Sequence, residues 1–173
     1  MDYYGDKLVE LLGLPEDNDE IIKMRKAYNA PKPLLDSFFK EYGGTSIYID
    51  EHKLELFFSD SSFFDGTDSG IYGNNDLLFS GVVFRQGTDI DLPFGLTPQD
   101  ALADVYQKLG RKEDYDDTDM VPQKIWEFTT KNGMRALLYV IFDSGKYENV
   151  AIVNVFLFEP EHEEVLEDIK VVH

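Results

Sequence analysis

Hydrophobic residues recur along this chain with two different periods. Up to residue 43 their spacing is helical and predicts three short helices, over residues 6–12, 19–28 and 34–42. In the third of these helices, Leu35, Phe38 and Phe39 are predicted to form the apolar face. The N-terminal part of the chain is therefore predicted to be helical and to end at Gly43.

Beyond Gly43 the alternation is typical of β-strands, rich in aromatic and β-branched residues. Asn132-Gly133 is the strongest hairpin signal in the chain. Strands are predicted over 46–49, 53–58, 77–85, 124–129, 135–142 and 150–158. Loops are predicted over 59–76 and 111–121, and an acidic tail with a short helix or a frayed end is predicted over 159–173.

A fourth helix separates the two sets of strands, within the segment Leu92 to Gly110. Thr97 stands where an N-cap belongs, Pro98 follows at the first helical position, and Gly110 is placed to end the helix. The apolar face of this helix is expected to hold Leu102, Val105, Tyr106 and Leu109.

The order of elements suggests two related halves, residues 1–91 and 92–173. Leu12-Gly13 is followed by Glu16-Asp17, and Leu109-Gly110 is followed at the same offset by Glu113-Asp114. Such short self-similarity is a hint of duplication. We therefore predict an α+β fold in which each half has short helices followed by an antiparallel β-meander, with the halves sharing one core.

The chain is strongly acidic. Its 173 residues include 34 Asp and Glu against 16 Lys and Arg, a formal net charge of -18. Such a charge repels nucleic acid and attracts basic proteins, although it can also serve solubility alone. No segment approaches the roughly 20 apolar residues of a membrane helix. The N-terminus lacks the features of a signal peptide, so a cytoplasmic location is expected.

Two acidic segments are candidates for binding a basic partner. Both combine carboxylates with aromatic residues, a combination that suits steering and anchoring at protein interfaces. The first segment surrounds Tyr115 and contains Glu113, Asp114, Asp116, Asp117 and Asp119; the second, between residues 60 and 76, offers Asp65, Asp68 and Tyr72. The alternatives are that the first is only a solvated loop and that the aromatics of the second fold back onto the sheet.

Nothing in the sequence favours catalysis. The three histidines are scattered, and nucleophile-elbow, P-loop and dinucleotide-binding motifs are absent from the sequence. The chain has no cysteine, and the Asp65 to Gly70 segment lacks the spacing of a calcium loop. We therefore expect no catalytic residue, cofactor or metal, and a hydrolase is the less favoured alternative.

Two resemblances point to inhibition by binding. A helix ending in Leu-Gly before an antiparallel meander resembles the tandem helix-plus-sheet fold of β-lactamase inhibitory proteins and BamE-like lipoproteins. The run L-P-F-G-L-T-x-x-D, with Trp126 in a following hairpin, is similar to small bacterial proteins that act as immunity partners of secreted toxins. The chain departs from the BamE-like pattern in lacking a lipobox cysteine, and Arg111-Lys112 stand where a proline usually follows Leu-Gly.

Overall fold

The fold is α+β, built on one antiparallel sheet. The computed structural model describes residues 2–117, 122–143, 146–160 and 163–171. Its helices are α1 (Gly5–Glu10), α2 (Asp19–Ala27), α3 (Ser37–Tyr42), α4 (Ser62–Asp65), α5 (Leu102–Leu109) and α6 (Glu163–Asp168). Its strands are β1 (Gly44–Ile49), β2 (Leu54–Asp60), β3 (Leu77–Phe84), β4 (Tyr115–Asp117), β5 (Gln123–Thr129), β6 (Arg135–Phe142) and β7 (Val150–Leu157).

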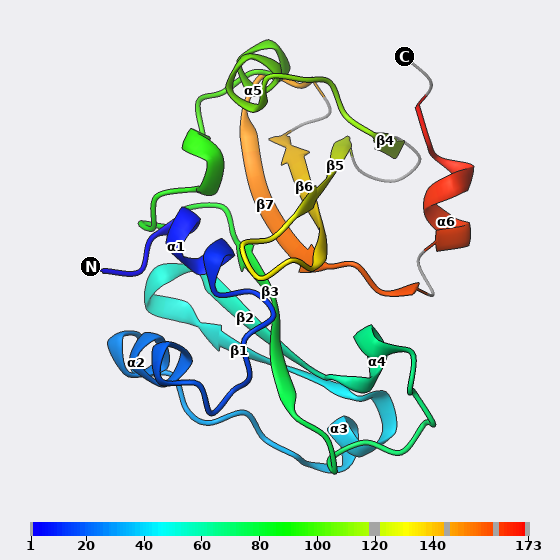
Figure 1. Ribbon diagram of the computed structural model, residues 1–173. Helices are drawn as coiled ribbons and strands as arrows, with labels where there is room; N and C mark the ends of the chain where they lie inside the picture. The colour runs from blue at the N-terminus through cyan, green and yellow to red at the C-terminus, as the bar shows by residue number, and fades with distance from the viewer. Residues whose placement is uncertain (1, 118–121, 144–145, 161–162, 172–173) are drawn as a thin grey trace.

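Seven strands form the sheet in the order β1-β2-β3-β7-β6-β5-β4. Strands β1 to β3 make one meander and β4 to β7 make another, seen as the lower and upper parts of Figure 1. The two meanders join where β3 pairs with β7, with Val82 opposite Val155. The two meanders therefore form one continuous sheet, whereas the duplication of the two halves stays a prediction.

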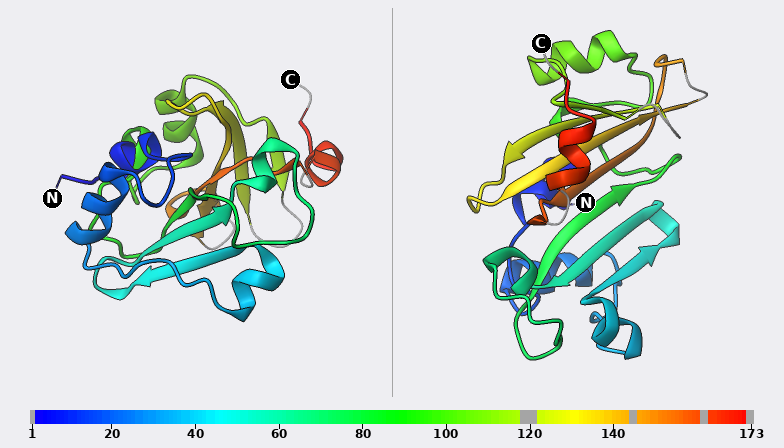
Figure 2. Two further views of the ribbon diagram at one scale, coloured as in Figure 1. Left: turned by 60° about the horizontal axis from the view of Figure 1, so that its bottom comes forward. Right: turned by 90° about the vertical axis from the view of Figure 1, so that its right-hand side faces the viewer.

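One large core covers both meanders on the same face of the sheet. Buried residues from both parts of the chain belong to it, including Leu12, Phe58, Val82, Trp126 and Val155. A smaller core lies under α6 and contains Tyr115, Ile125, Leu137, Phe158 and Leu166. Figure 2 shows α6 lying across the strands of the upper meander.

The helix after Leu92 begins later than the sequence predicted. Thr97 is not its N-cap, because Asp100 accepts hydrogen bonds from the Thr97 amide (2.8 Å) and hydroxyl (2.9 Å) and closes a separate turn. Helix α5 starts at Leu102, where Asp104 accepts from the Ala101 amide at 2.9 Å. Its end is as predicted, with Gly110 in the left-handed conformation at φ +74°.

Two predicted loops contain regular structure. The charged segment 111–121 includes the short strand β4, which pairs with β5 through Tyr115 opposite Ile125. The segment 59–76 includes the single turn α4.

The third helix begins at Ser37, after the N-cap Asp36, instead of at residue 34. None of the helices in the described ranges has the length and apolar character needed to cross a bilayer.

Candidate functional site

The acidic segment around Tyr115 is mostly engaged within the protein. Tyr115 is 5% exposed and donates a hydrogen bond from its hydroxyl to Glu127 at 3.1 Å. Burial, together with Glu127, raises the pKa of Tyr115 to about 12. The exposed aromatic anchor expected at this position is therefore not found, because the ring belongs to the core under α6.

The carboxylates of this segment also have partners. Glu113 and Asp116 surround the buried ammonium of Lys124, at 3.2 and 2.7 Å from its Nζ. Asp114 pairs with Arg111 at 2.7 Å and accepts from the Glu127 amide at 2.8 Å. Asp117 accepts from the Gln123 side chain at 2.9 Å, and Asp119 lies outside the described residues. Contact of these residues with a partner stays a prediction, but much of their charge is neutralised locally.

The Lys124 cluster is an ion-pair triad in which Lys124 and Glu113 are buried and Asp116 is partly exposed. Burial opposes the charge on Lys124, but hydrogen bonds from its ammonium to Asp116 and Glu113 outweigh burial and raise its pKa. Burial likewise opposes ionisation of Glu113, yet Tyr106 and Lys124 hold the pKa of Glu113 below its usual value. The Tyr147 ring lies 5.1 Å from the ammonium. This cluster stabilises the β4–β5 end of the sheet.

The second predicted segment is organised around the buried carboxylate of Asp60, at the end of β2. One oxygen of Asp60 accepts from the Ser62 amide (3.0 Å), the Ser62 hydroxyl (2.7 Å) and the Asn75 amide group (3.0 Å). The other accepts from the Gly73 amide at 3.1 Å. Burial opposes ionisation, but these hydrogen bonds outweigh it and lower the pKa of Asp60. Asp60 thus ties both ends of the loop to the sheet.

The aromatic side chains of this loop do fold back, and they pack on the end of α3. Phe63 and Tyr72 stack with their ring centroids 5.1 Å apart. A Cβ atom at Gly43, which ends α3 at φ +73°, would meet Phe63 and would lie 3.0 Å from the Tyr72 ring. The Asp60 amide also donates to the Gly43 carbonyl at 2.8 Å. Helix α3 and the β2–β3 loop therefore form one continuous surface.

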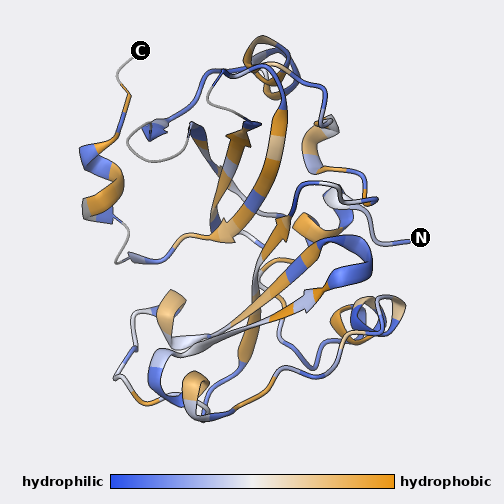
Figure 3. Cartoon of the chain, turned by 180° about the vertical axis from the view of Figure 1, so that it is seen from behind, coloured by the Kyte–Doolittle hydropathy of each residue, from blue (hydrophilic) through white to orange (hydrophobic). Residues whose placement is uncertain are grey.

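This surface exposes large apolar side chains. Leu34 is 67% exposed, and Phe38 and Tyr42 are each 57% exposed, with the two rings in contact at 4.6 Å between centroids. Leu35 and Ile71 are also exposed. Of the predicted apolar face of the third helix, only Phe39 is buried. Figure 3 shows apolar residues on α3 and α4 at the same end of the molecule.

The loop that packs on the end of α3 carries exposed carboxylates. Asp65 and Asp68 are exposed and accept hydrogen bonds from the Thr67 and Gly70 amides, both at 2.9 Å. Tyr72 donates to Asp68 at 3.3 Å. Within the described ranges, no lysine or arginine lies within ion-pair distance of Asp65, Asp68 or Asp76. We call the exposed residues Leu34, Leu35, Phe38, Tyr42, Asp65, Asp68 and Ile71 the α3–loop surface.

Gly43 has no room for a side chain, so a substitution at this position tests the packing of the surface. We expect Gly43→Ala to lower the free energy of unfolding by about 2 to 4 kcal/mol, because the methyl group adds a clash with Phe63 to the strain of a left-handed alanine. Gly110→Ala is the matched control, since Gly110 has a nearly identical φ of +74° and open space around it. Urea denaturation of both variants measures the difference, and equal losses would contradict the packing of Phe63 on Gly43.

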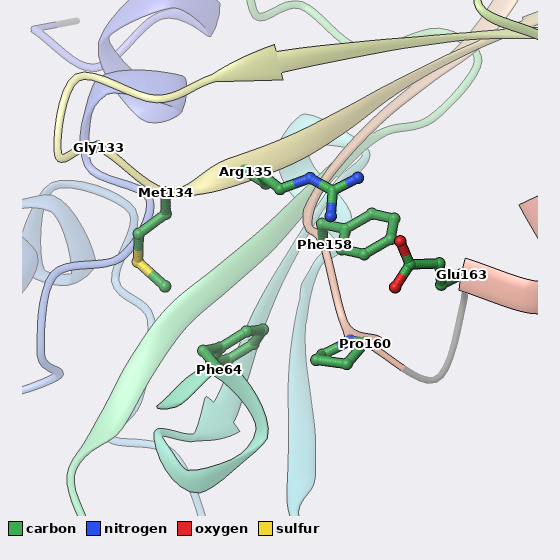
Figure 4. Close-up of a pocket in the computed structure, with 7 residues that line it drawn as sticks. All are labelled: Phe64, Gly133, Met134, Arg135, Phe158, Pro160 and Glu163. Carbon is green, nitrogen blue, oxygen red and sulfur yellow. The ribbon is translucent and has the colours of Figure 1, made fainter. Parts of the chain in front are cut away.

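A separate depression of about 340 Å³ lies at the end of the sheet, lined by Phe64, Gly133, Met134, Arg135, Phe158, Pro160 and Glu163 (Figure 4). The Arg135 guanidinium lies 3.8 Å above the centre of the Phe158 ring, and its Nε donates to Glu127 at 2.7 Å. The arginine is thus already held by two neighbours. The lining brings together no nucleophile with a general base.

Comparison of the chain with protein-family models, with curated proteins and with solved structures finds no match. Among the described residues, histidines and carboxylates do not gather in groups of three or more that suit a metal ion. The α3–loop surface is therefore the candidate site that the geometry itself favours. Of the residues predicted from the sequence, Asp65, Asp68 and Tyr72 belong to it or support it.

Proposed function

We propose that this chain is an acidic protein-binding module, an immunity protein that neutralises a cognate bacterial toxin by occluding its active site. The observation that carries the proposal is the α3–loop surface, where Phe38 and Tyr42 are exposed on α3 and the loop packed on the end of α3 carries exposed carboxylates. Among the described residues, no lysine or arginine lies within ion-pair distance of Asp65 or Asp68. Buried aromatic residues supply most of the energy of protein interfaces, and surrounding charges speed encounter with a partner of opposite charge.

The chemistry of such a partner follows from the charge of the module. A toxin that acts on an anionic substrate needs a basic cleft, and the lysines and arginines of that cleft would meet Asp65 and Asp68. The net charge of -18 disfavours binding of nucleic acid by this chain itself. The alternative is a structural or regulatory domain whose acidity serves solubility, and it predicts no stoichiometric partner.

The proposal is tested by affinity capture with the immobilised protein, using lysate of the source organism at low salt and then a salt gradient. We expect one stoichiometric basic protein that is toxic when expressed alone. Phe38→Ala should weaken its binding about 30-fold, the loss typical of an interface hot spot. Asp65→Asn with Asp68→Asn should slow association and flatten its salt dependence.

A control variant separates the site from the overall charge. Asp91→Asn with Glu148→Gln removes the same charge from exposed positions elsewhere in the chain, and we expect its association rate to stay within about twofold of the wild type. Equal effects of both pairs would argue that only the net charge matters. Recovery of scattered basic proteins that elute together at modest salt would favour the alternative in which acidity serves solubility.

A further inference from the structure

The outer edge of strand β1 is open. The amide of Arg85 donates to the carbonyl of Lys53, which shows that residues 53, 55 and 57 direct their backbone groups toward β3. Residues 54 and 56 therefore bond with β1, opposite Ile49 and Ile47. Along a strand, the backbone groups of successive residues point alternately to one side and the other. The N–H and C=O groups of Ile47 and Ile49 face β2, so those of Ser46 and Tyr48 point away from the sheet.

No segment of the described chain covers this edge with backbone hydrogen bonds. Beyond the ladder with β2, the described residues form no backbone bond to Ser46 or Tyr48. Ser46 and Tyr48 are exposed, and the strand Gly44–Ile49 contains neither proline nor lysine, the residues that commonly protect an edge. Such an edge is a template for one more strand.

The opposite edge of the same sheet is closed. The Asp116 amide donates to the Ile169 carbonyl at 3.0 Å, and the Val171 amide donates to the Asp114 carbonyl at 3.1 Å. The segment after α6 thus lies along β4 and occupies its outer side, where Figure 1 shows the chain passing close to β4. The protein protects one edge with its own chain and leaves the other exposed.

A strand added to β1 would meet side chains suited to a partner. On one face of the sheet it would lie beside Tyr48, which is 48% exposed and has Arg85 over its ring at 5.5 Å. The helix that leads directly into β1 is α3, with the exposed Phe38 and Tyr42. The open edge and the α3–loop surface are therefore neighbouring parts of one region.

We propose that β1 binds an extended, basic segment of the partner protein as an eighth strand of the sheet. A second copy of this chain is the less suitable occupant, because it would bring another net charge of -18 to a chain that already carries that charge. A segment carrying lysine or arginine reverses that repulsion. Backbone hydrogen bonds to Ser46 and Tyr48 would supply affinity for an extended segment. The positive charge of the segment would make the site prefer it over others.

The test uses a capped eight-residue peptide that alternates lysine with valine, compared with one that alternates glutamate with valine. Amide hydrogen exchange followed by NMR should show Ser46 and Tyr48 exchanging fast in the free protein and at least tenfold more slowly with saturating Lys–Val peptide. Ile47 and Ile49 should be protected in both states. Absence of this protection, or equal protection by the Glu–Val peptide, would overturn the proposal.

Matched variants at one position isolate the backbone group. Ser46→Pro and Ser46→Ala both lose the hydroxyl that donates to Glu55 at 2.9 Å, but only proline also removes the outward N–H. We expect proline to weaken peptide binding at least tenfold and alanine to change it less than twofold. Equal binding by the two variants would refute strand addition. If Ser46→Pro does not fold, Tyr48→Pro against Tyr48→Ala makes the same comparison.

This inference rests on the proposed function, and the two can fail separately. If Ser46→Pro still retains the basic protein captured from lysate while Phe38→Ala loses it, strand addition is wrong and the proposed function stands. If the wild-type protein captures no stoichiometric basic partner, the proposed function fails whatever the peptide shows. Self-association that disappears in Ser46→Pro but persists in Ser46→Ala would instead identify a second copy as the occupant and overturn the proposal.

Discussion

Replacing Lys124 by methionine is expected to lower the free energy of unfolding by about 3 kcal/mol, because it leaves the buried carboxylate of Glu113 and the partly exposed carboxylate of Asp116 without their cation. The raised pKa of Lys124 means that its contribution is complete at neutral pH. It is lost only as the pH rises above about 10.4, the unfolded value, and through the higher folded value. Urea denaturation at pH 7 measures the loss.

Two further variants show whether the loss comes from unpaired charge. Lys124→Met combined with Glu113→Gln and Asp116→Asn should recover at least half of it, since no buried carboxylate then remains in the cluster. Lys23→Met removes the cation of the exposed pair with Glu20 and should leave stability nearly unchanged, because solvent screens that pair. A loss below about 1 kcal/mol for Lys124→Met would mean that water solvates the two carboxylates.

The second large effect is expected at Asp60. Asp60→Ala should lower the free energy of unfolding by about 3 kcal/mol, because the donors of Ser62, Gly73 and Asn75 lose a shared charged acceptor. The loop between residues 61 and 76 should also become much more sensitive to protease, since both of its ends are released. Asp76→Ala, at an exposed position of the same loop, is the control and should cost less than about 0.5 kcal/mol.

The pH dependence of stability distinguishes the charge of Asp60 from its size. Its pKa is lowered in the folded protein, so the unfolded chain binds the proton first. The stability from Asp60 is therefore complete above about pH 4, the unfolded value, and is lost as the pH falls through the folded value. The difference in stability between wild type and Asp60→Ala should shrink from pH 5 to pH 3, and an unchanged difference would exclude a role for the carboxylate charge.

The strands could be predicted from the sequence because their signal is local. Alternating apolar residues and the Asn132-Gly133 turn predicted β6 with its observed limits, Arg135–Phe142. Strand β4 could not be predicted in this way, because Tyr115–Asp117 contains two carboxylates and becomes a strand by pairing with β5 and Ile169. The start of α5 was misplaced because Thr97 and Asp100 carry an N-cap pattern but form an isolated turn.

The candidate site depends on what covers each side chain, and the sequence pattern does not contain that information. The apolar face of the third helix was visible in Leu35, Phe38 and Phe39, but only the structure shows that about half of each of the first two side chains stays exposed. Conversely, the dense charge of residues 113–117 indicated exposure, whereas Lys124 draws Glu113 into the interior. Asp60 lies within the segment that the sequence predicted as a loop. In the structure it ends β2 and accepts hydrogen bonds from residues at both ends of that loop.

The pairing of β3 with β7 has a consequence for how the sheet is assembled. Val82 lies opposite Val155, so the two meanders are joined by residues far apart in the sequence, and β7 is the last of the seven described strands in chain order. Contacts between distant residues form slowly, since a long loop must close before they stabilise anything. On the ribosome, the first meander must therefore wait with its β3 edge unpaired until β7 has been synthesised.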